Sequence, residues 1–215
     1  MSAVRTAGLA KDAAATFFLD PEVICMSSPY GGYDAIAADN DRHVNPAHLN
    51  QGLFVSSATS ALRQIHDEMG AAVRYVISST WRESLSREQL EVVFRRAGLG
   101  FVADRLHAGE MWRTPPKFGR SRRINEIAEW LDRHHQGEPF AILDHTHSGA
   151  SLMPTVQPPP LPSNVPAPRH PSEAAPHAFA ERVVLCDENV GLTVDYVPFI
   201  VAALCRAVPV TRIAA

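Results

Sequence analysis

Short apolar runs alternate with longer amphipathic stretches along most of this chain. Each run is only four or five residues long and mostly apolar, with Arg74 and Arg182 as the charged members, which is typical of strands that are buried in a parallel sheet. The runs span residues 16–19 with an apolar continuation at 23–26, then 73–77, 140–143 and 182–186. We therefore expect a strand at each of these places.

The stretches between the runs have apolar residues at helical spacing. They cover residues 56–69, 86–97 and 121–134, and after the last run Gly191-Leu192-Thr193 leads into a final apolar helix that ends at about residue 207. Gly70 is placed to end the first helix, and Ser86 with Gln89 forms a capping box that begins the second. Strands that alternate with helices of this length predict βαβ units, and hence a three-layer α/β/α Rossmannoid fold around a mostly parallel sheet.

Two stretches interrupt the alternation. Residues 27–51 are rich in turn-forming residues, and a connection this long suggests a functional loop or a small cap. Residues 148–180 contain nine of the 17 prolines and only two charges, Arg169 and Glu173. We expect a disordered, proline-rich insertion there, and a ligand for a proline-binding domain is a less favoured interpretation. Residues 1–15 form a tail that we expect to be disordered, and 16–215 form a single domain.

Composition narrows the class of protein. A length of 215 residues suits one domain, and a net charge of −3 gives no general attraction to nucleic acid or to an anionic membrane. No apolar stretch approaches the roughly 18 residues of a membrane span. The three cysteines are far apart, so we expect small buried thiols in a reducing, cytoplasmic setting rather than disulfides or structural zinc.

Polar residues follow the ends of the apolar runs, where parallel sheets bind their ligands. They are Asp20 and Glu22, Ser79 and Thr80, Asp144 and His145, and Asp187. The cations Lys117 and Arg123 flank the start of the helix before the third strand. A single one of these acids is equally well explained as a helix cap or a loop acid. Their occurrence together at the strand ends favours a catalytic or ligand-binding site.

Clustered carboxylates repel one another unless a cation lies between them, and oxygen ligands suit Mg²⁺. One carboxylate can attack phosphorus, and a second can move the proton of the leaving group. A serine hydroxyl with a lysine or arginine can hold the phosphoryl oxygens.

The order of these motifs resembles the haloacid dehalogenase (HAD) superfamily. More narrowly, it resembles the small bacterial HAD-domain proteins related to the HAD domain of Swiss-Army-knife RNA repair proteins. The resemblance covers roughly residues 16–207 without the proline-rich segment. It depends on the motifs Ser79-Thr80-Trp81-Arg82, Arg123-x-x-Glu126, a strand that ends at Asp144, and Gly191-Leu192-Thr193.

The resemblance implies a HAD-like fold with a small cap or none, and a phosphohydrolase that uses Mg²⁺, with Mn²⁺ as an alternative. It implies that Asp20 is the nucleophile and Glu22 the acid–base group. Ser79 and either Lys117 or Arg123 would be the remaining catalytic residues, Thr80 and Arg82 would contact substrate, and Asp20, Glu22, Asp144 and His145 would hold the metal. The substrate would be a small phosphomonoester or, with less support, a nucleic-acid end; the oligomeric state is not indicated.

The chain departs from the family pattern in two places. Glu22 and Val23 stand where the family has aspartate followed by glycine or threonine, and the longer side chain moves the acid by about 1 Å, which can cost on the order of 10²-fold in rate. His145 stands where a second acid is usual, and a nitrogen ligand favours a softer metal such as Mn²⁺ or Zn²⁺. An alternative is therefore a catalytically impaired HAD-fold protein that binds or regulates a partner.

Overall fold

The computed structural model describes residues 14–25, 53–115, 123–153, 179, 181–187 and 189–208. Several sequence-based expectations lie outside these ranges. They concern the tail before residue 14, the loop or cap at 27–51, Lys117, and most of the proline-rich segment.

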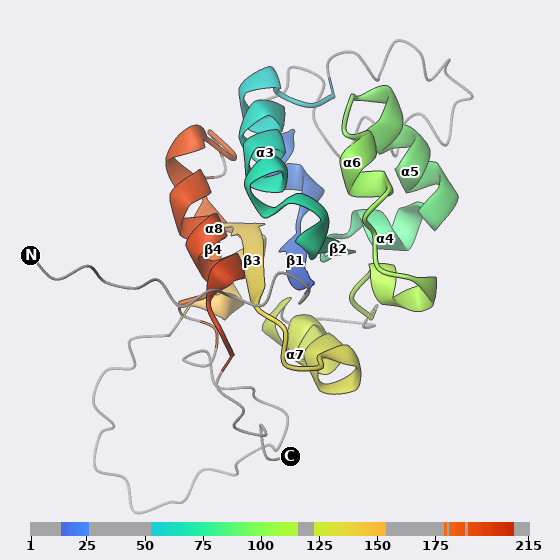
Figure 1. Ribbon diagram of the computed structural model, residues 1–215. Coiled ribbons are helices and arrows are strands. Elements are labelled where there is room, and N and C mark those ends of the chain that lie inside the picture. The colour runs from blue at the N-terminus through green and yellow to red at the C-terminus, as the bar shows by residue number, and fades with distance from the viewer. Residues whose placement is uncertain are drawn as a thin grey trace, which may run out of the picture.

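Four parallel strands form the central sheet, in the order β2-β1-β3-β4 (Figure 1). The strands are β1 (Ala15–Leu19), β2 (Val73–Ile77), β3 (Phe140–His145) and β4 (Val183–Cys186). Each lies within two residues of an apolar run that predicted it. The expected parallel sheet is confirmed, and all four described strands are parallel.

Helices cover both faces of this sheet, which confirms the three-layer arrangement (Figure 1). The longer helices are α3 (Ser56–Met69), α5 (Arg87–Arg96), α7 (Arg123–His134) and α8 (Val197–Cys205). The short α-helices are α4 (Trp81–Ser84) and α6 (Gly100–Ala103). The 3₁₀ turns are η1 (Pro21–Ile24), η2 (Gly70–Ala72), η3 (Gly109–Trp112), η4 (Ser148–Leu152) and η6 (Val194–Tyr196).

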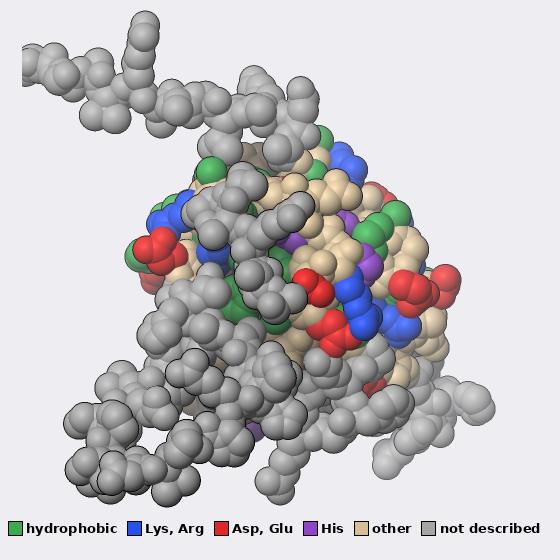
Figure 2. Space-filling view, turned by 90° about the horizontal axis from the view of Figure 1, so that it is seen from below, with side chains coloured by type: hydrophobic (Ala, Val, Ile, Leu, Met, Phe, Trp, Pro, Cys, Tyr) green, Lys and Arg blue, Asp and Glu red, His purple; other side chains and the backbone are tan. Residues whose placement is uncertain are grey.

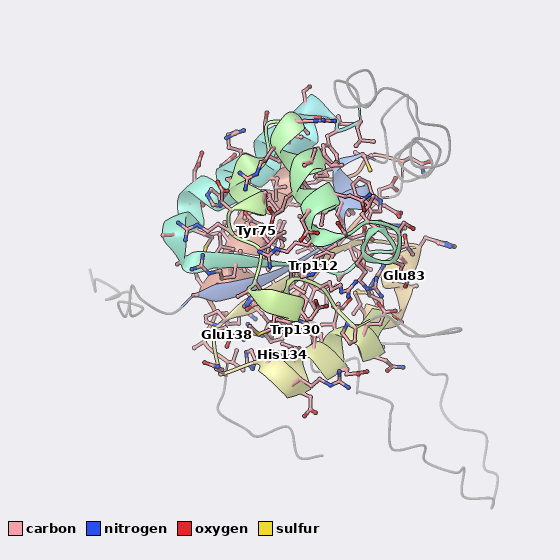
Figure 3. All side chains as sticks on the ribbon, turned by 90° about the vertical axis from the view of Figure 1, so that its right-hand side faces the viewer. Tyr75, Glu83, Trp112, Trp130, His134 and Glu138 are labelled. Atoms are coloured by element: carbon pink, nitrogen blue, oxygen red, sulfur yellow. The ribbon has the colours of Figure 1, made fainter. Side chains whose placement is uncertain are left out.

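The inner strand β1 shows why the runs are mostly apolar. Phe17 and Leu19 face the core formed with α3, α5 and α8, whereas Phe18 faces the smaller core under α7. Trp130 of α7 meets Phe18 edge to face with ring centroids 5.1 Å apart, and its indole N–H donates to the carbonyl of Met111 (Figure 3). Since both faces are covered, the strand from Phe17 to Leu19 is apolar, and the buried Thr16 hydroxyl donates to Glu138 at 3.0 Å.

The apolar continuation at residues 23–26 is not a strand, which corrects that prediction for its described part. Residues 21–24 turn into η1 immediately after β1. Pro21 occupies the first position of this turn, and the Asp20 carboxylate accepts a hydrogen bond from the Glu22 N–H. Val23 and Ile24 are buried, so their apolar character reflects packing beneath the sheet edge rather than strand pairing.

Three further findings concern the remaining expectations. The proline-rich segment begins within the folded domain, because Ser148–Leu152 forms η4 and Leu152 is fully buried. Cys25 and Cys186 are buried as expected, but Cys205 is exposed at the end of α8, where its thiol lies 3.9 Å from the Met69 sulfur. Among the helices of the described ranges, none is both long and apolar enough to cross a membrane.

Candidate active site

Strand register brings the two aspartates to the same level of the sheet. The Asp20 N–H donates to the Leu143 carbonyl at 3.0 Å, so Asp20 lies beside the residue that follows Leu143. On the other side of β1, the Ser78 N–H donates to the Leu19 carbonyl at 3.0 Å. These bonds place the ends of β1, β2 and β3 next to one another, which the expected strand-end site requires.

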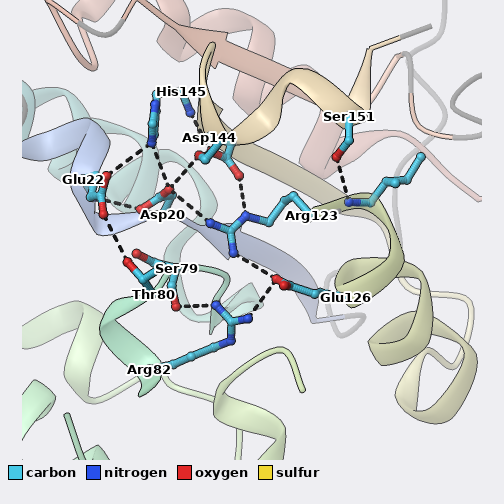
Figure 4. Close-up of polar contacts among 12 residues, drawn as sticks. Asp20, Glu22, Ser79, Thr80, Arg82, Arg123, Glu126, Asp144, His145 and Ser151 are labelled. Carbon is cyan, nitrogen blue, oxygen red and sulfur yellow. Dashed lines mark hydrogen bonds and ion pairs between the residues drawn. The ribbon is translucent and has the colours of Figure 1, made fainter. Parts of the chain in front are cut away.

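Arg123, at the first position of α7, joins the two aspartates (Figure 4). Its Nε donates to Asp144 Oδ2 at 3.0 Å, and its Nη2 lies 3.6 Å from Asp20 Oδ2. A cation at a helix N-terminus is disfavoured by the helix dipole, so these carboxylates account for its position. Of the two cations left open by the sequence, Arg123 is at the site, and Lys117 lies outside the described residues.

The electrostatics of Asp20 are unusual. Burial raises its pKa to about 7, the Asp144 carboxylate acts in the same direction, and the Arg123 guanidinium opposes both. The side chain is only 1% exposed. A buried carboxylate beside a second one favours any cation that can approach it.

Glu22 and His145 form a second pair next to Asp20. His145 Nε2 lies 3.2 Å from a Glu22 carboxylate oxygen and 3.7 Å from Asp20 Oδ2. Thr80 donates to the other Glu22 oxygen at 3.3 Å. The hydrogen bond from His145 lowers the pKa of Glu22 despite partial burial. Burial of His145 acts against its charge, but Glu22 and the aspartates together raise its pKa.

One ligand atom from each of Asp20, Glu22 and His145 lies within 4.8 Å of the others, a spacing suited to a shared cation. Asp144 lies beside this group, but both of its oxygens already accept protein hydrogen bonds, from the His145 N–H and from Ser148 and Arg123. Metal ligation by Asp144 remains a prediction.

The loop after β2 lies on the opposite side of Asp20 from His145 in the view of Figure 4. Ser79 is fully buried and its hydroxyl accepts from the Trp81 N–H at 3.4 Å. Arg82 is 2% exposed and donates to the main-chain carbonyls of Ser79 and Thr114. The loop therefore reaches the site, whereas direct contacts of Ser79, Thr80 and Arg82 with substrate remain predictions.

Two residues of this cluster were not predicted from the sequence as members of the site. Ser148 donates to Asp144 and lies 3.3 Å from Asp20 Oδ2, although the sequence placed it in the proline-rich insertion. Glu126 is a buried carboxylate that accepts from Arg123 at 3.0 Å. The sequence does contain a hint of Glu126, because this residue falls on the apolar face of α7. A carboxylate that is buried there needs a cation or a hydrogen-bond donor as its partner.

The Gly191-Leu192 segment packs against η1, the turn that contains Glu22. The Leu192 N–H donates to the Val23 carbonyl at 2.8 Å, and Gly191 has a φ of +76°. A Cβ atom at Gly191 would overlap that same carbonyl oxygen. Glycine is therefore required both by the backbone conformation and by the close approach of η1.

We expect Gly191→Ala to lower the free energy of unfolding by about 2 kcal/mol or more, because strain and a steric clash add together. Chemical denaturation measures it. Gly98→Ala is the matched control, since Gly98 has the same φ of +76° but nothing lies within 4 Å of the place that its Cβ would take. Equal losses in the two variants would contradict the close packing of Gly191 against η1.

Similarity to known proteins is found at the level of one family. The family model described as the HAD domain in Swiss Army Knife RNA repair proteins matches residues 29–197. The matched range includes Ser79, Arg123 and Asp144 and begins after Asp20 and Glu22. Searches of curated proteins and of solved structures found no match.

Proposed function

This chain belongs to the family of HAD domains found in Swiss Army Knife RNA repair proteins, and from that premise we propose that it is a metal-dependent phosphohydrolase that acts through a phospho-aspartate at Asp20. The substrate is a phosphomonoester, either a small molecule or the terminal phosphate of a nucleic acid. The family name supports the second class, and the open choice between the two is part of the test below.

One observation carries the proposal. Asp20, which is buried and has a raised pKa, lies at the carboxyl end of the central strand and faces both a guanidinium and a second acidic side chain. A structural acid in this place would need only one partner. A nucleophile that attacks phosphorus needs a cation for the phosphoryl oxygens and a proton-transfer group within reach.

The residues of the chain then have separate tasks. A carboxylate oxygen of Asp20 attacks phosphorus, and the bond from phosphorus to the leaving oxygen breaks. Glu22 protonates that oxygen with the proton that it shares with His145, and afterwards takes a proton from the water that attacks phosphorus, which breaks the bond to Asp20. Arg123 and the Ser79 loop hold the phosphoryl oxygens as charge builds on them.

The donor set fits a divalent cation. Two carboxylates and one imidazole lie within 4.8 Å of one another, and the burial of Asp20 makes a positive charge there favourable. Asp20, Glu22 and His145 would hold the ion, with Asp144 next to them, and a bound Mg²⁺ or Mn²⁺ supplies charge neutralisation for the phosphoryl group. The oxygen of Glu22 that faces Thr80 is the one that we assign to proton transfer.

His145 gives a prediction about metal preference. We expect His145→Asp to shift binding toward Mg²⁺, so that the ratio of Mn²⁺ to Mg²⁺ affinity falls by roughly tenfold, because an oxygen-only ligand set suits the harder ion. Isothermal titration of each metal measures the affinities directly. His147→Asp is the matched control, since it adds the same charge at an exposed neighbour. An unchanged ratio in His145→Asp would exclude His145 as a ligand.

The proposed function is tested by turnover of an aryl phosphate with Mg²⁺, with Mn²⁺ and with EDTA. The same preparation is assayed on oligonucleotides that carry a 3′- or 5′-phosphate. If the substrate is a nucleic-acid end, turnover of the oligonucleotides should fall steeply as salt rises. On the face drawn in Figure 2, the described acidic and basic side chains lie side by side. Folded protein without turnover on either substrate class would contradict the proposal and favour the non-catalytic alternative.

A further inference from the structure

A buried row of ion pairs connects the loop after β2 with Asp20 (Figure 4). The row begins at Arg82, whose Nη2 lies 2.8 Å from Glu126 Oε2. The same Glu126 oxygen accepts from Arg123 Nη1 at 3.0 Å. Arg123 then contacts the two aspartates of the site. The proposed mechanism uses only the Arg123 end of this row.

Each nitrogen of the Arg123 guanidinium faces a different carboxylate. Nε faces Asp144, Nη2 faces Asp20 and Nη1 faces Glu126. A planar guanidinium has one orientation in its plane that satisfies three such partners. Glu126 is the partner that lies away from the reacting groups, so it sets this orientation without occupying the space of the substrate.

Arg82 is fixed in a similar way. Its Nε donates to the Thr114 carbonyl at 3.0 Å, and its Nη1 donates to the Ser79 carbonyl. Glu126 therefore ties the main chain of the Ser79 loop to the guanidinium of Arg123 through a single oxygen.

The three side chains that link the Ser79 loop to Asp20 are buried, so water cannot replace a lost ion pair. The side chains of Arg82, Glu126 and Arg123 are only 1%, 9% and 8% exposed. Burial raises the pKa of Glu126, and the two guanidinium groups oppose that rise. Loss of the carboxylate charge would leave two buried guanidinium groups facing each other, and the freed end of Arg123 would turn to other partners.

We infer that Glu126 is a positioning residue, which orients Arg123 toward the phosphoryl group and holds the Ser79 loop at the matching distance. This inference rests on the proposed function for its catalytic consequence, whereas the orientation of Arg123 can be measured without turnover.

Glu126→Gln is the direct test, because it keeps the shape of the side chain and removes its charge. We expect kcat on an aryl phosphate to fall by roughly 10- to 100-fold with KM changed by less than about threefold, since a misplaced cation loses the charge that develops in the transition state. Glu129→Gln is the matched control on the same helix, where Glu129 pairs with Arg133. It should leave both constants unchanged.

A double-mutant cycle distinguishes positioning from a general structural role. If Glu126 acts through Arg123, then Glu126→Gln should cost little more when Arg123 is already lysine, because a lysine cannot contact all three carboxylates. Multiplied losses in the double variant would contradict the inference. Thermal unfolding checks that each variant is folded. If Glu126→Gln does not fold, Glu126→Asp takes its place, because it keeps the charge and shortens the side chain.

A measurement that does not depend on turnover tests the role of Glu126 separately from the proposed phosphohydrolase activity. The Nε–H signal of Arg123, assigned by its loss in Arg123→Lys, should exchange slowly with solvent in the unaltered protein and at least about tenfold faster in Glu126→Gln. An unchanged exchange rate would overturn the inference whether or not the protein has activity. Absence of turnover in the unaltered protein would contradict the proposed function instead, and the exchange rate would still decide the role of Glu126.

Discussion

Asp20→Asn is expected to lower metal-dependent turnover of phosphomonoesters by on the order of 10⁴-fold or more, because the substitution removes the attacking oxygen and leaves only binding and charge stabilisation. Rates on an aryl phosphate under saturating metal measure the effect. Substrate binding should be retained in part, since Arg123 and the Ser79 loop remain in place.

The stability of the same variant separates chemistry from folding. The pKa of Asp20 is raised to about 7, so its ionisation costs folding free energy as the pH rises from the unfolded value toward 7. Neutral asparagine avoids this cost, and Asp20→Asn should unfold at a temperature equal to or above that of the unaltered protein at pH 8 without metal. At pH 4 the difference should shrink. A variant that is folded and retains turnover would exclude Asp20 as the nucleophile.

Asp187→Asn is the matched control for this substitution. Asp187 also follows a strand of the sheet, and the sequence grouped it with the other strand-end acids. In the structure it is exposed and accepts a hydrogen bond from the Asn189 N–H at 2.8 Å, which is a turn contact. We expect its replacement to leave turnover unchanged.

Arg123→Lys is expected to lower kcat by roughly 10²-fold, although the charge is kept. A single ammonium cannot face Asp20, Asp144 and Glu126 in the geometry of the guanidinium fork. The carboxylates would then be less well compensated, and the phosphoryl oxygens would lose a positioned donor. Steady-state kinetics with each metal measure the loss.

The control for this substitution lies on the same helix. Arg133 forms a surface pair with Glu129 near the end of α7, so Arg133→Lys should change neither rate nor stability appreciably. If Arg123→Lys also retained full activity, Arg123 would be a structural counter-ion, and the phosphate cation would have to be sought elsewhere, with Lys117 as the first candidate.

The sheet could be predicted because its two inner strands, β1 and β3, are buried on both faces. Mostly apolar runs mark β1, β2, β3 and β4 without any knowledge of partners, and Gly70 ends α3 at the predicted place with a φ of +58°. Burial also explains why the apolar residues after Asp20 wrongly predicted a continuation of the strand. Val23 and Ile24 are as buried as strand residues, and only Pro21 with the Asp20 side chain turns the backbone into η1.

The site could be predicted only as far as its residues follow strands. Asp20 and Asp144 could be predicted because parallel strands end at one edge. Arg123 could be predicted because it begins the helix before the third strand, and the family motif supports it. Ser148 reaches Asp20 across 128 positions of sequence, and no local pattern reports such a contact. Its neighbour Gly149 shows how tightly this turn is packed, since a Cβ there would lie 2.5 Å from a Leu185 methyl carbon.

The position of His145 has a different consequence under each hypothesis, the phosphohydrolase and the non-catalytic binding protein. It is buried and pairs with Glu22, whereas its neighbour His147 is exposed. In an enzyme this arrangement gives the site a nitrogen ligand and places the acid–base group near a proton. In a non-catalytic binding or regulatory protein, the same pair would hold the site closed to a cation, and added metal would leave phosphate affinity unchanged.

The central claim is a covalent bond between Asp20 and phosphorus, and one measurement tests it directly. Protein that is turning over a phosphomonoester labelled at phosphorus is quenched with acid, reduced with borohydride and digested, because borohydride converts an aspartyl phosphate to homoserine. The account predicts homoserine at position 20 with metal and substrate, and none in Asp20→Asn or with EDTA. Metal-dependent turnover with aspartate unchanged at position 20 would contradict it.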